Sequence, residues 1–136
     1  KKGNRSILSG VPDSLPALIK ANRIQQKVRG VGFDWEQKNQ IWDKVGEELQ
    51  ELQDEVEGER KDQIESEFGD LLFSLINAAR LYEVDPETAL ERTNKKFIKR
   101  FKYLEQQTIY KGQSLRDMSL EEMDVIWEEA KKSYAD

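Results

Sequence analysis

The chain has 136 residues, a formal net charge of −5, and neither cysteine nor histidine. This length suits a single domain with a hydrophobic core, and the negative charge argues against binding duplex nucleic acid, whose phosphates meet basic surfaces. The lack of cysteine excludes disulfides, a thiolate nucleophile and zinc–cysteine sites, and it favours a cytoplasmic protein. The lack of histidine removes the usual general base and the Glu-x-x-His ligands of di-iron bundles. No apolar run approaches the ~20 residues of a membrane span, so we expect no membrane partner.

The first residue is lysine rather than methionine, and the first ten residues are mostly small or polar. We therefore expect residues 1–12 to be a linker or N-terminal tail and residues 13–136 to form one helical domain. The chain is expected to be the C-terminal part of a longer protein.

Two helices are predicted in the first half of the domain. Asp13 and Ser14 resemble an N-cap before a first helix that ends at Gly30. Its apolar residues recur at helical spacing: Leu15, Leu18, Ile19, Ile24 and Val28. A connector over 31–34 is predicted next, with Trp35 opening the following element. An amphipathic helix over 36–57 then carries apolar residues every three or four positions, and Gly58 closes it.

Three further helices are predicted in the rest of the chain. The helix over 59–82 is apolar over most of its circumference, which indicates that it is buried. Pro86 begins a helix that continues to Tyr110. Ser119 and Glu122 form a capping-box pattern at the start of a last helix over 120–133. Short connections between long helices favour an all-α fold, an antiparallel bundle of about five helices with a four-helix core.

Five acidic residues form the pattern EExxE followed, after fifteen residues, by ExxD. On a helix, side chains three or four residues apart lie about 5–6 Å apart on one face. If the two helices are antiparallel neighbours, the carboxylates converge, and the converging charges indicate a hard divalent cation. The alternatives are a solvated acidic face and, for the last aspartate, an ion pair with a facing lysine or arginine. The five residues are Glu47, Glu48, Glu51, Glu67 and Asp70.

Basic residues that suit phosphate oxygens follow downstream. Lys96 and Arg100 are four residues apart on one predicted helix, and Trp127 and Lys131 are four apart on the last. On spacing alone, a solvated basic face and a packed tryptophan are the better explanations.

Taken in order, these motifs resemble the MazG nucleotide pyrophosphohydrolases, all-α enzymes of the superfamily that also includes the dimeric dUTPases. The resemblance covers almost the whole chain. Its motifs are Leu15-Pro16-Ala17-Leu18, Val31-Gly32-Phe33-Asp34-Trp35, Asp43-Lys44-Val45, Glu47-Glu48-Leu49-Gln50-Glu51, Glu67-Phe68-Gly69-Asp70-Leu71-Leu72-Phe73, Asn94-Lys95-Lys96-Phe97-Ile98-Lys99-Arg100, and Glu122-Met123 with Trp127 and Lys131.

The resemblance implies Mg²⁺-dependent hydrolysis of nucleoside triphosphates to monophosphate and pyrophosphate by a homodimer or higher homo-oligomer, with Mn²⁺ as an alternative ion. By position it implies four metal ligands: Glu48, Glu51, Glu67 and Asp70. It also implies five residues that hold the phosphates and the nucleotide: Lys44, Lys96, Arg100, Trp127 and Lys131. With no histidine or cysteine, the predicted nucleophile is a water activated by the metal, and Glu47 is the candidate to orient or deprotonate it.

Two other functions stay open at this point. One is a catalytically silent helical oligomerisation module, and the other is a regulatory domain that binds nucleotides without hydrolysing them. The two differ from an enzyme in turnover and in whether the bound nucleotide is returned intact.

Overall fold

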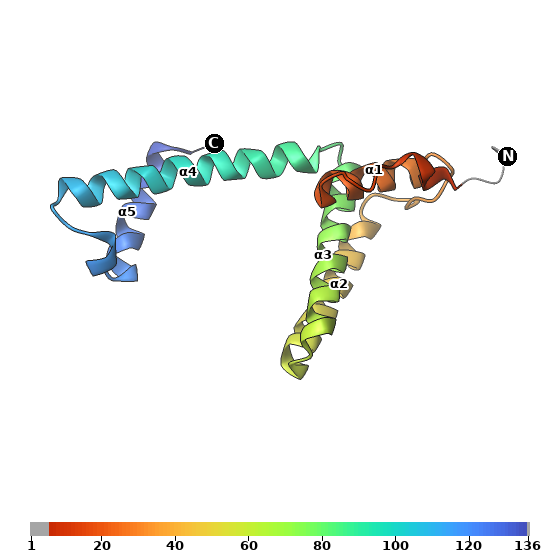
Figure 1. Cartoon of the computed structure of the whole chain (residues 1–136), viewed down its shortest axis with the longest axis horizontal. Helices are drawn as coiled ribbons and strands as arrows, with labels where there is room; N and C mark the ends of the chain where they lie inside the picture. The colour runs from red at the N-terminus through yellow and green to blue at the C-terminus, as the bar shows by residue number, and fades with distance from the viewer. Residues whose placement is uncertain (1–5, 136) are drawn as a thin grey trace. The chain divides into compact units, whose positions relative to one another are not determined.

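The computed structural model describes residues 6–135, and the regular structure in this range is entirely helical (Figure 1). The helices fall into two compact units, one that ends at Glu87 and one that begins at Thr88. Neither unit by itself contains four of the α-helices, so the predicted four-helix core stays a prediction. The elements are η2 (Ile7–Gly10), α1 (Ala17–Arg29), α2 (Gln40–Gly58), α3 (Lys61–Leu81), α4 (Pro86–Tyr110), η3 (Leu115–Asp117) and α5 (Leu120–Ser133).

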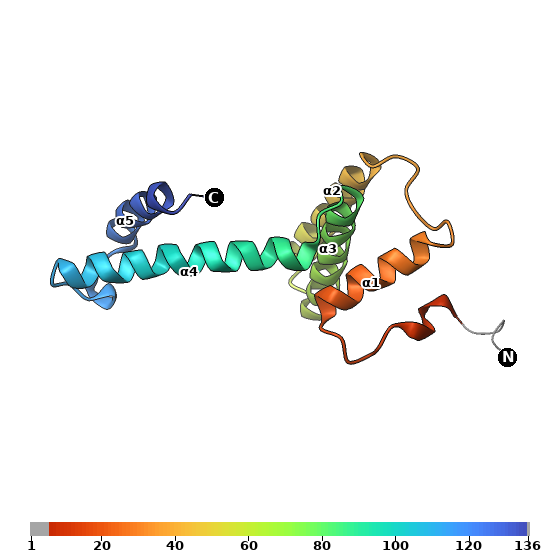
Figure 2. The same cartoon turned by 90° about the horizontal axis from the view of Figure 1, so that it is seen from above.

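In the first unit, α2 and α3 form a helical hairpin, and α1 packs against α3 (Figures 1 and 2). The hairpin turns at Glu59, a non-glycine residue in the left-handed conformation with φ 56°. A core of Ile41, Ala78 and Leu81, with Val45 packed on it, lies between the two helices. The hairpin thus makes the two acidic halves of the pattern neighbours.

The start of α1 differs from the prediction. Asp13 and Ser14 lie outside the helix, and Pro16 occupies the N-cap position without a side-chain capping bond. A residue before proline is pushed toward extended conformations. Leu15 therefore cannot join the helix, and the carbonyl oxygen of Asp13 accepts a hydrogen bond from Lys20 Nζ at 2.7 Å instead.

The connector between α1 and α2 is longer than predicted, because α2 begins at Gln40 and not at 36. Gly32 has φ 91°, a conformation that favours glycine, and turns the chain out of α1. The carboxylate of Asp34 then accepts a hydrogen bond from the Trp35 N–H at 2.9 Å. Residues 30–39 form this loop, called the connector loop below.

The ends of α3 match the prediction within two residues, but its predicted burial is wrong for the chain by itself. Phe68 and Leu72 are 50% and 56% exposed, and Asp70 is exposed too. The reason is that α1 and α2 cover only part of the circumference of α3.

The second unit confirms both predicted helices, α4 and α5. A core of Leu104, Met118 and Ile126 joins α4, η3 and α5. At the start of α5, Ser119 Oγ accepts a hydrogen bond from the Glu122 N–H at 3.1 Å, and Glu122 Oε1 accepts one from the Ser119 N–H at 2.9 Å. The predicted capping box is therefore present, and these hydrogen bonds lower the pKa of Glu122.

The predicted division into a tail and a helical domain is not tested by this architecture. The short helix η2 lies within the predicted tail, of which residues 1–5 lie outside the described part, and the division at residues 12 and 13 stays a prediction. Across residues 6–135, no helix has the length and apolar character needed to cross a membrane.

Candidate metal centre and adjoining cleft

Three of the predicted ligands meet between α2 and α3. Glu48 lies on α2, and Glu67 and Asp70 lie three residues apart on one face of α3. One carboxylate oxygen from each lies within 4.8 Å of the other two. The antiparallel hairpin therefore gathers three of the five acidic residues of the pattern.

Two oxygens of this cluster are buried without a hydrogen-bond partner, Glu48 Oε2 and Glu67 Oε2. The other oxygen of Glu48 accepts a hydrogen bond from Lys44 Nζ at 2.7 Å, one helical turn away on α2. A buried carboxylate that is only half satisfied is unfavourable unless a cation completes its contacts. The donor set, all carboxylate oxygens, fits a hard divalent cation such as Mg²⁺.

The electrostatics of Glu67 point the same way. Burial raises the pKa of Glu67, and so do the negative charges of Glu51, Asp70 and Glu48 and a hydrogen bond shared with Glu51. Crowded carboxylates raise one another's pKa because their charges repel, and a bound cation relieves that repulsion. Glu51, the fourth predicted ligand, thus adjoins Glu67, although it is exposed and not one of the three that meet.

Lys44 and Glu47 flank the cluster on α2. The hydrogen bond to Glu48 and the charges of Glu48, Glu47 and Glu51 raise the pKa of Lys44. Glu47 is exposed and lies outside the three converging carboxylates, where water can reach it. The two side chains therefore border the cluster without belonging to it.

Within the described part of the chain, Asp70 lacks the ion pair that was the alternative to metal binding. Across residues 6–135, no lysine or arginine forms an ion pair with its carboxylate. A Cβ added to the neighbouring Gly69 would meet no atom within 4 Å, so a close helix crossing within the chain does not explain that glycine.

A cleft of about 680 Å³ adjoins the cluster and shares Glu48 and Asp70 with it. This volume is in the range of small-molecule sites. Its lining combines aromatic and aliphatic side chains with a few polar groups. Besides Glu48 and Asp70, the residues that line the cleft are Ile24, Gln25, Val28, Phe33, Asp34, Trp35, Ile41, Lys44, Phe73, Ser74, Asn77 and Arg80.

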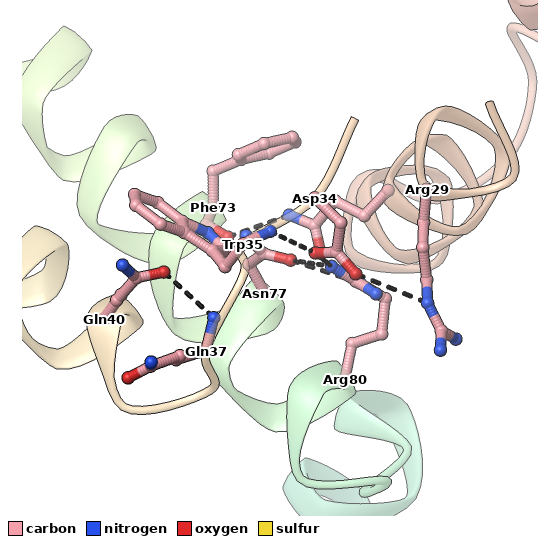
Figure 3. A network of polar contacts seen from close by, with 9 residues as sticks. Arg29, Asp34, Trp35, Gln37, Gln40, Phe73, Asn77 and Arg80 are labelled. Carbon is pink, nitrogen blue, oxygen red and sulfur yellow. Dashed lines mark hydrogen bonds and ion pairs between the residues drawn. The ribbon is translucent and has the colours of Figure 1, made fainter. Parts of the chain in front are cut away.

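One wall of the cleft is held by a polar network that the sequence did not predict (Figure 3). Arg80 Nη2 donates to Asp34 Oδ1 at 2.9 Å, and Arg29 Nε lies 3.3 Å from Asp34 Oδ2. Burial alone would raise the pKa of Asp34, but the hydrogen bonds from Arg80 and the Trp35 N–H, with the charges of both arginines, lower it overall. The only available signal was an aspartate in a glycine-containing connector.

The other predicted site residues lie in the second unit, where each has contacts of its own. Arg100 Nε donates to the carbonyl of Tyr134 at 3.2 Å, and Lys131 lies 3.4 Å from Glu128. Trp127 packs on the core of that unit and against Phe97, with ring centroids 5.1 Å apart. Lys96 is half-buried on α4. Trp127 is thus partly buried within its own unit.

Comparison with known proteins supports the resemblance. The MazG nucleotide pyrophosphohydrolase domain matches residues 37–104, which are 68 of the 136 residues, or half of the chain. The matched range holds Lys44, the five acidic residues, Lys96 and Arg100.

Three relatives align with nearly the whole chain. The chain is 41% identical over 133 residues to the nucleoside triphosphate pyrophosphohydrolase/pyrophosphatase MazG of Thermotoga maritima, covering 96% of this chain and 49% of that protein. It is 38% identical over 138 residues to the nucleoside triphosphate pyrophosphohydrolase of Escherichia coli, covering 100% and 52%. It is 50% identical over 129 residues to the uncharacterized protein YabN of Bacillus subtilis, covering 94% and 26%. The chain spans about half the length of the first two. By its matched domain, the chain belongs to the family of MazG nucleotide pyrophosphohydrolase domains.

Proposed function

We propose that the chain hydrolyses nucleoside triphosphates to nucleoside monophosphate and pyrophosphate with Mg²⁺, or with Mn²⁺ as an alternative ion. The observation that carries this proposal is the carboxylate cluster of Glu48, Glu67 and Asp70, with its unpaired buried oxygens, beside a cleft of nucleotide size. Membership of the MazG family and the names of the two aligned pyrophosphohydrolases support it.

In this proposal Glu48, Glu67 and Asp70 hold the metal, and Glu51 joins them from beside Glu67. A bound Mg²⁺ neutralises phosphate charge and lowers the pKa of a coordinated water. Glu47 would orient the attacking water or take its proton, a role that its exposed position beside the cluster supports.

Lys44 neutralises phosphate charge from the α2 side. Its ammonium group has three N–H donors, and one of them binds Glu48. Arg100 Nε donates to the carbonyl of Tyr134, and in this proposal the other N–H groups of its guanidinium bind phosphate. The parts of Lys96, Arg100, Trp127 and Lys131 in nucleotide binding stay predictions that single substitutions can test.

We also propose that the chain works as a homodimer or higher homo-oligomer. Several large apolar side chains of α3 are more than 40% exposed: Phe68, Leu72, Phe73 and Leu75. Apolar groups that gather on one exposed helix usually mark a contact with another chain. A second copy would restore the predicted burial of α3 and complete a four-helix core. Light scattering after size-exclusion chromatography measures the assembly directly.

The location follows from the chemistry and from the composition. A chain without cysteine that consumes nucleoside triphosphates suits the cytoplasm. The net charge of −5 supports a nucleotide substrate held by local basic groups and not a nucleic-acid duplex as partner.

The test of the activity is to incubate the protein with nucleoside triphosphates and Mg²⁺ and to separate the products. We expect monophosphate plus pyrophosphate, with activity lost in EDTA and in Glu48→Ala and Asp70→Ala. Glu57→Gln, on an exposed position of the same helix α2, is the matched control and should keep full activity. Diphosphate plus phosphate, or nucleotide returned intact, would contradict the proposal; intact nucleotide would indicate a binding module.

A further inference from the structure

We propose that Arg80 is a positioning residue, which holds the connector loop through Asp34 so that Phe33 and Trp35 form the aromatic wall of the nucleotide cleft. That the cleft binds a nucleotide rests on the proposed function. The new element is that the contact between Arg80 and Asp34 holds the aromatic wall in position.

The connector loop has little packing of its own. Residues 31–39 are all exposed, and Phe33 is 77% exposed. Besides the main cleft, a second hollow of about 290 Å³ is lined by the same Asp34, Trp35 and Arg80. A segment that borders two hollows is poorly supported by side-chain packing, so its position depends on its polar anchors.

Arg80 is the buried anchor. Its side chain is only 7% exposed, and it lies in the last turn of α3. Nε and Nη2 both donate to Asn77 Oδ1, at 3.1 and 2.6 Å, which fixes the plane of the guanidinium one turn along the same helix. The same Nη2 then donates to Asp34 Oδ1 at 2.9 Å (Figure 3). A planar guanidinium can serve both oxygens at once, whereas a lysine ammonium has no such fixed geometry.

Asp34 links the side chain of Arg80 to the backbone of the aromatic wall. The oxygen that binds Arg80 also accepts the Trp35 N–H at 2.9 Å, so the arginine is one side chain away from the tryptophan backbone. Trp35 lines the cleft together with Phe33, Glu48 and Asp70.

Arg29 offers a matched control. It touches the other oxygen of the same carboxylate at 3.3 Å, but its side chain is 66% exposed. Exposed ion pairs contribute little to holding a structure, so replacing Arg29 with lysine alters a weak contact to Asp34 and leaves the Arg80 anchor in place.

The kinetic experiment compares Arg80→Lys with Arg29→Lys in the full chain. Since the wall contacts a part of the substrate that does not react, we expect Arg80→Lys to raise KM about tenfold or more and to keep kcat within about twofold. Arg29→Lys should leave both constants unchanged. A lower kcat at unchanged KM would mean only that less of the protein is folded, and it would overturn the inference, as would unchanged constants in Arg80→Lys.

A second measurement separates this inference from the proposed function. In protein labelled with 5-fluorotryptophan, the Trp35 resonance is assigned by Trp35→Phe and followed by ¹⁹F NMR without nucleotide. Arg80→Lys should shift or broaden that resonance and leave those of Trp42 and Trp127 in place. Asp34→Asn, which keeps an acceptor for the Trp35 N–H, should act in the same direction but less. If the wild-type chain hydrolyses no nucleotide, the proposed function fails, and the fluorine spectrum alone decides: an unmoved Trp35 resonance in both variants would overturn the inference.

Discussion

The two units hold their charged side chains in different ways. In the first unit, Glu48 and Glu67 each keep a buried oxygen without a hydrogen-bond partner. In the second, the acidic residues of α5 are used locally: Glu122 caps the helix, and Glu128 pairs with Lys131 on the surface. The helices α2 and α5 are both rich in glutamate, so an acidic composition alone does not mark a metal site. What distinguishes the site is that the carboxylates of Glu48 and Glu67, each with a buried unpaired oxygen, converge with that of Asp70, and this arrangement calls for a cation.

The largest expected effect breaks the buried cluster. Glu48→Gln should lower Mg²⁺-dependent hydrolysis by at least about 100-fold, because it removes a charged ligand. It should also abolish thermal stabilisation by Mn²⁺, which for an intact site is about 2.7 kcal/mol at 100 times Kd. Differential scanning calorimetry with and without Mn²⁺ measures this.

Glu121→Gln on α5 is the counterpart in the second unit and should change neither quantity. If both substitutions weakened Mn²⁺ binding alike, the contrast between the units would be wrong.

A smaller effect is expected at Arg100 in the second unit. If Arg100 binds phosphate as the family resemblance implies, Arg100→Gln should raise KM about tenfold, the equivalent of one charge-assisted hydrogen bond. Mn²⁺ binding by the first unit should not change. Steady-state kinetics together with calorimetric titration of the ion separate the two. An unchanged KM would show that the hydrogen bond to Tyr134 is the whole role of this arginine.

The capping box sets a third, local effect. Ser119→Ala removes the acceptor for the Glu122 N–H and should cost about 1 kcal/mol of helix stability. Hydrogen exchange should speed up for amides in α5 but not for those in α2 or α3. Ser133→Ala, in the last position of α5, is the control and should leave exchange unchanged. Faster exchange throughout the chain would mean that the two units do not unfold separately.

The smallest effect concerns pH. Because folding raises the pKa of Glu67, its contribution favours the folded state below the ordinary glutamate pKa and is lost as pH rises through the raised value. In EDTA, the melting temperature of the wild type should therefore fall relative to that of Glu67→Gln as the pH rises from about 4 to neutrality. A saturating divalent cation should remove that trend. A difference independent of pH would show that the carboxylates do not repel one another in the folded chain.

Sequence alone predicted the elements whose signals are local. Pro86 and the Ser119 capping box fixed the starts of α4 and α5, because a proline ring and a capping side chain act within one turn. The start of α2 was missed because the connector loop is held by Arg80, 46 residues from Asp34 along the chain. Such a contact leaves no periodic pattern.

The candidate site likewise has features that the sequence predicted and features that it could not predict. Helical spacing predicted that carboxylates of the two helices would converge, and the structure brings those of Glu48, Glu67 and Asp70 together. The exposure of Phe68 and Leu72 could not be predicted, because an apolar stripe shows that a helix needs cover but not which chain supplies it. The ligand roles themselves stay predictions until the substitutions are made.

The left-handed turn at Glu59 also sets the register of the acidic residues. Glu51 lies eight residues before it and Glu67 eight residues after it. Since each helical residue rises about 1.5 Å, the two side chains return to the same height on the two arms of the hairpin. The fifteen residues between the acidic halves are therefore a length requirement. One extra residue in a helical arm, between the turn and an acidic half, would rotate that half by about 100° about its helix axis, and it would disperse the cluster while every acidic residue remained in the sequence.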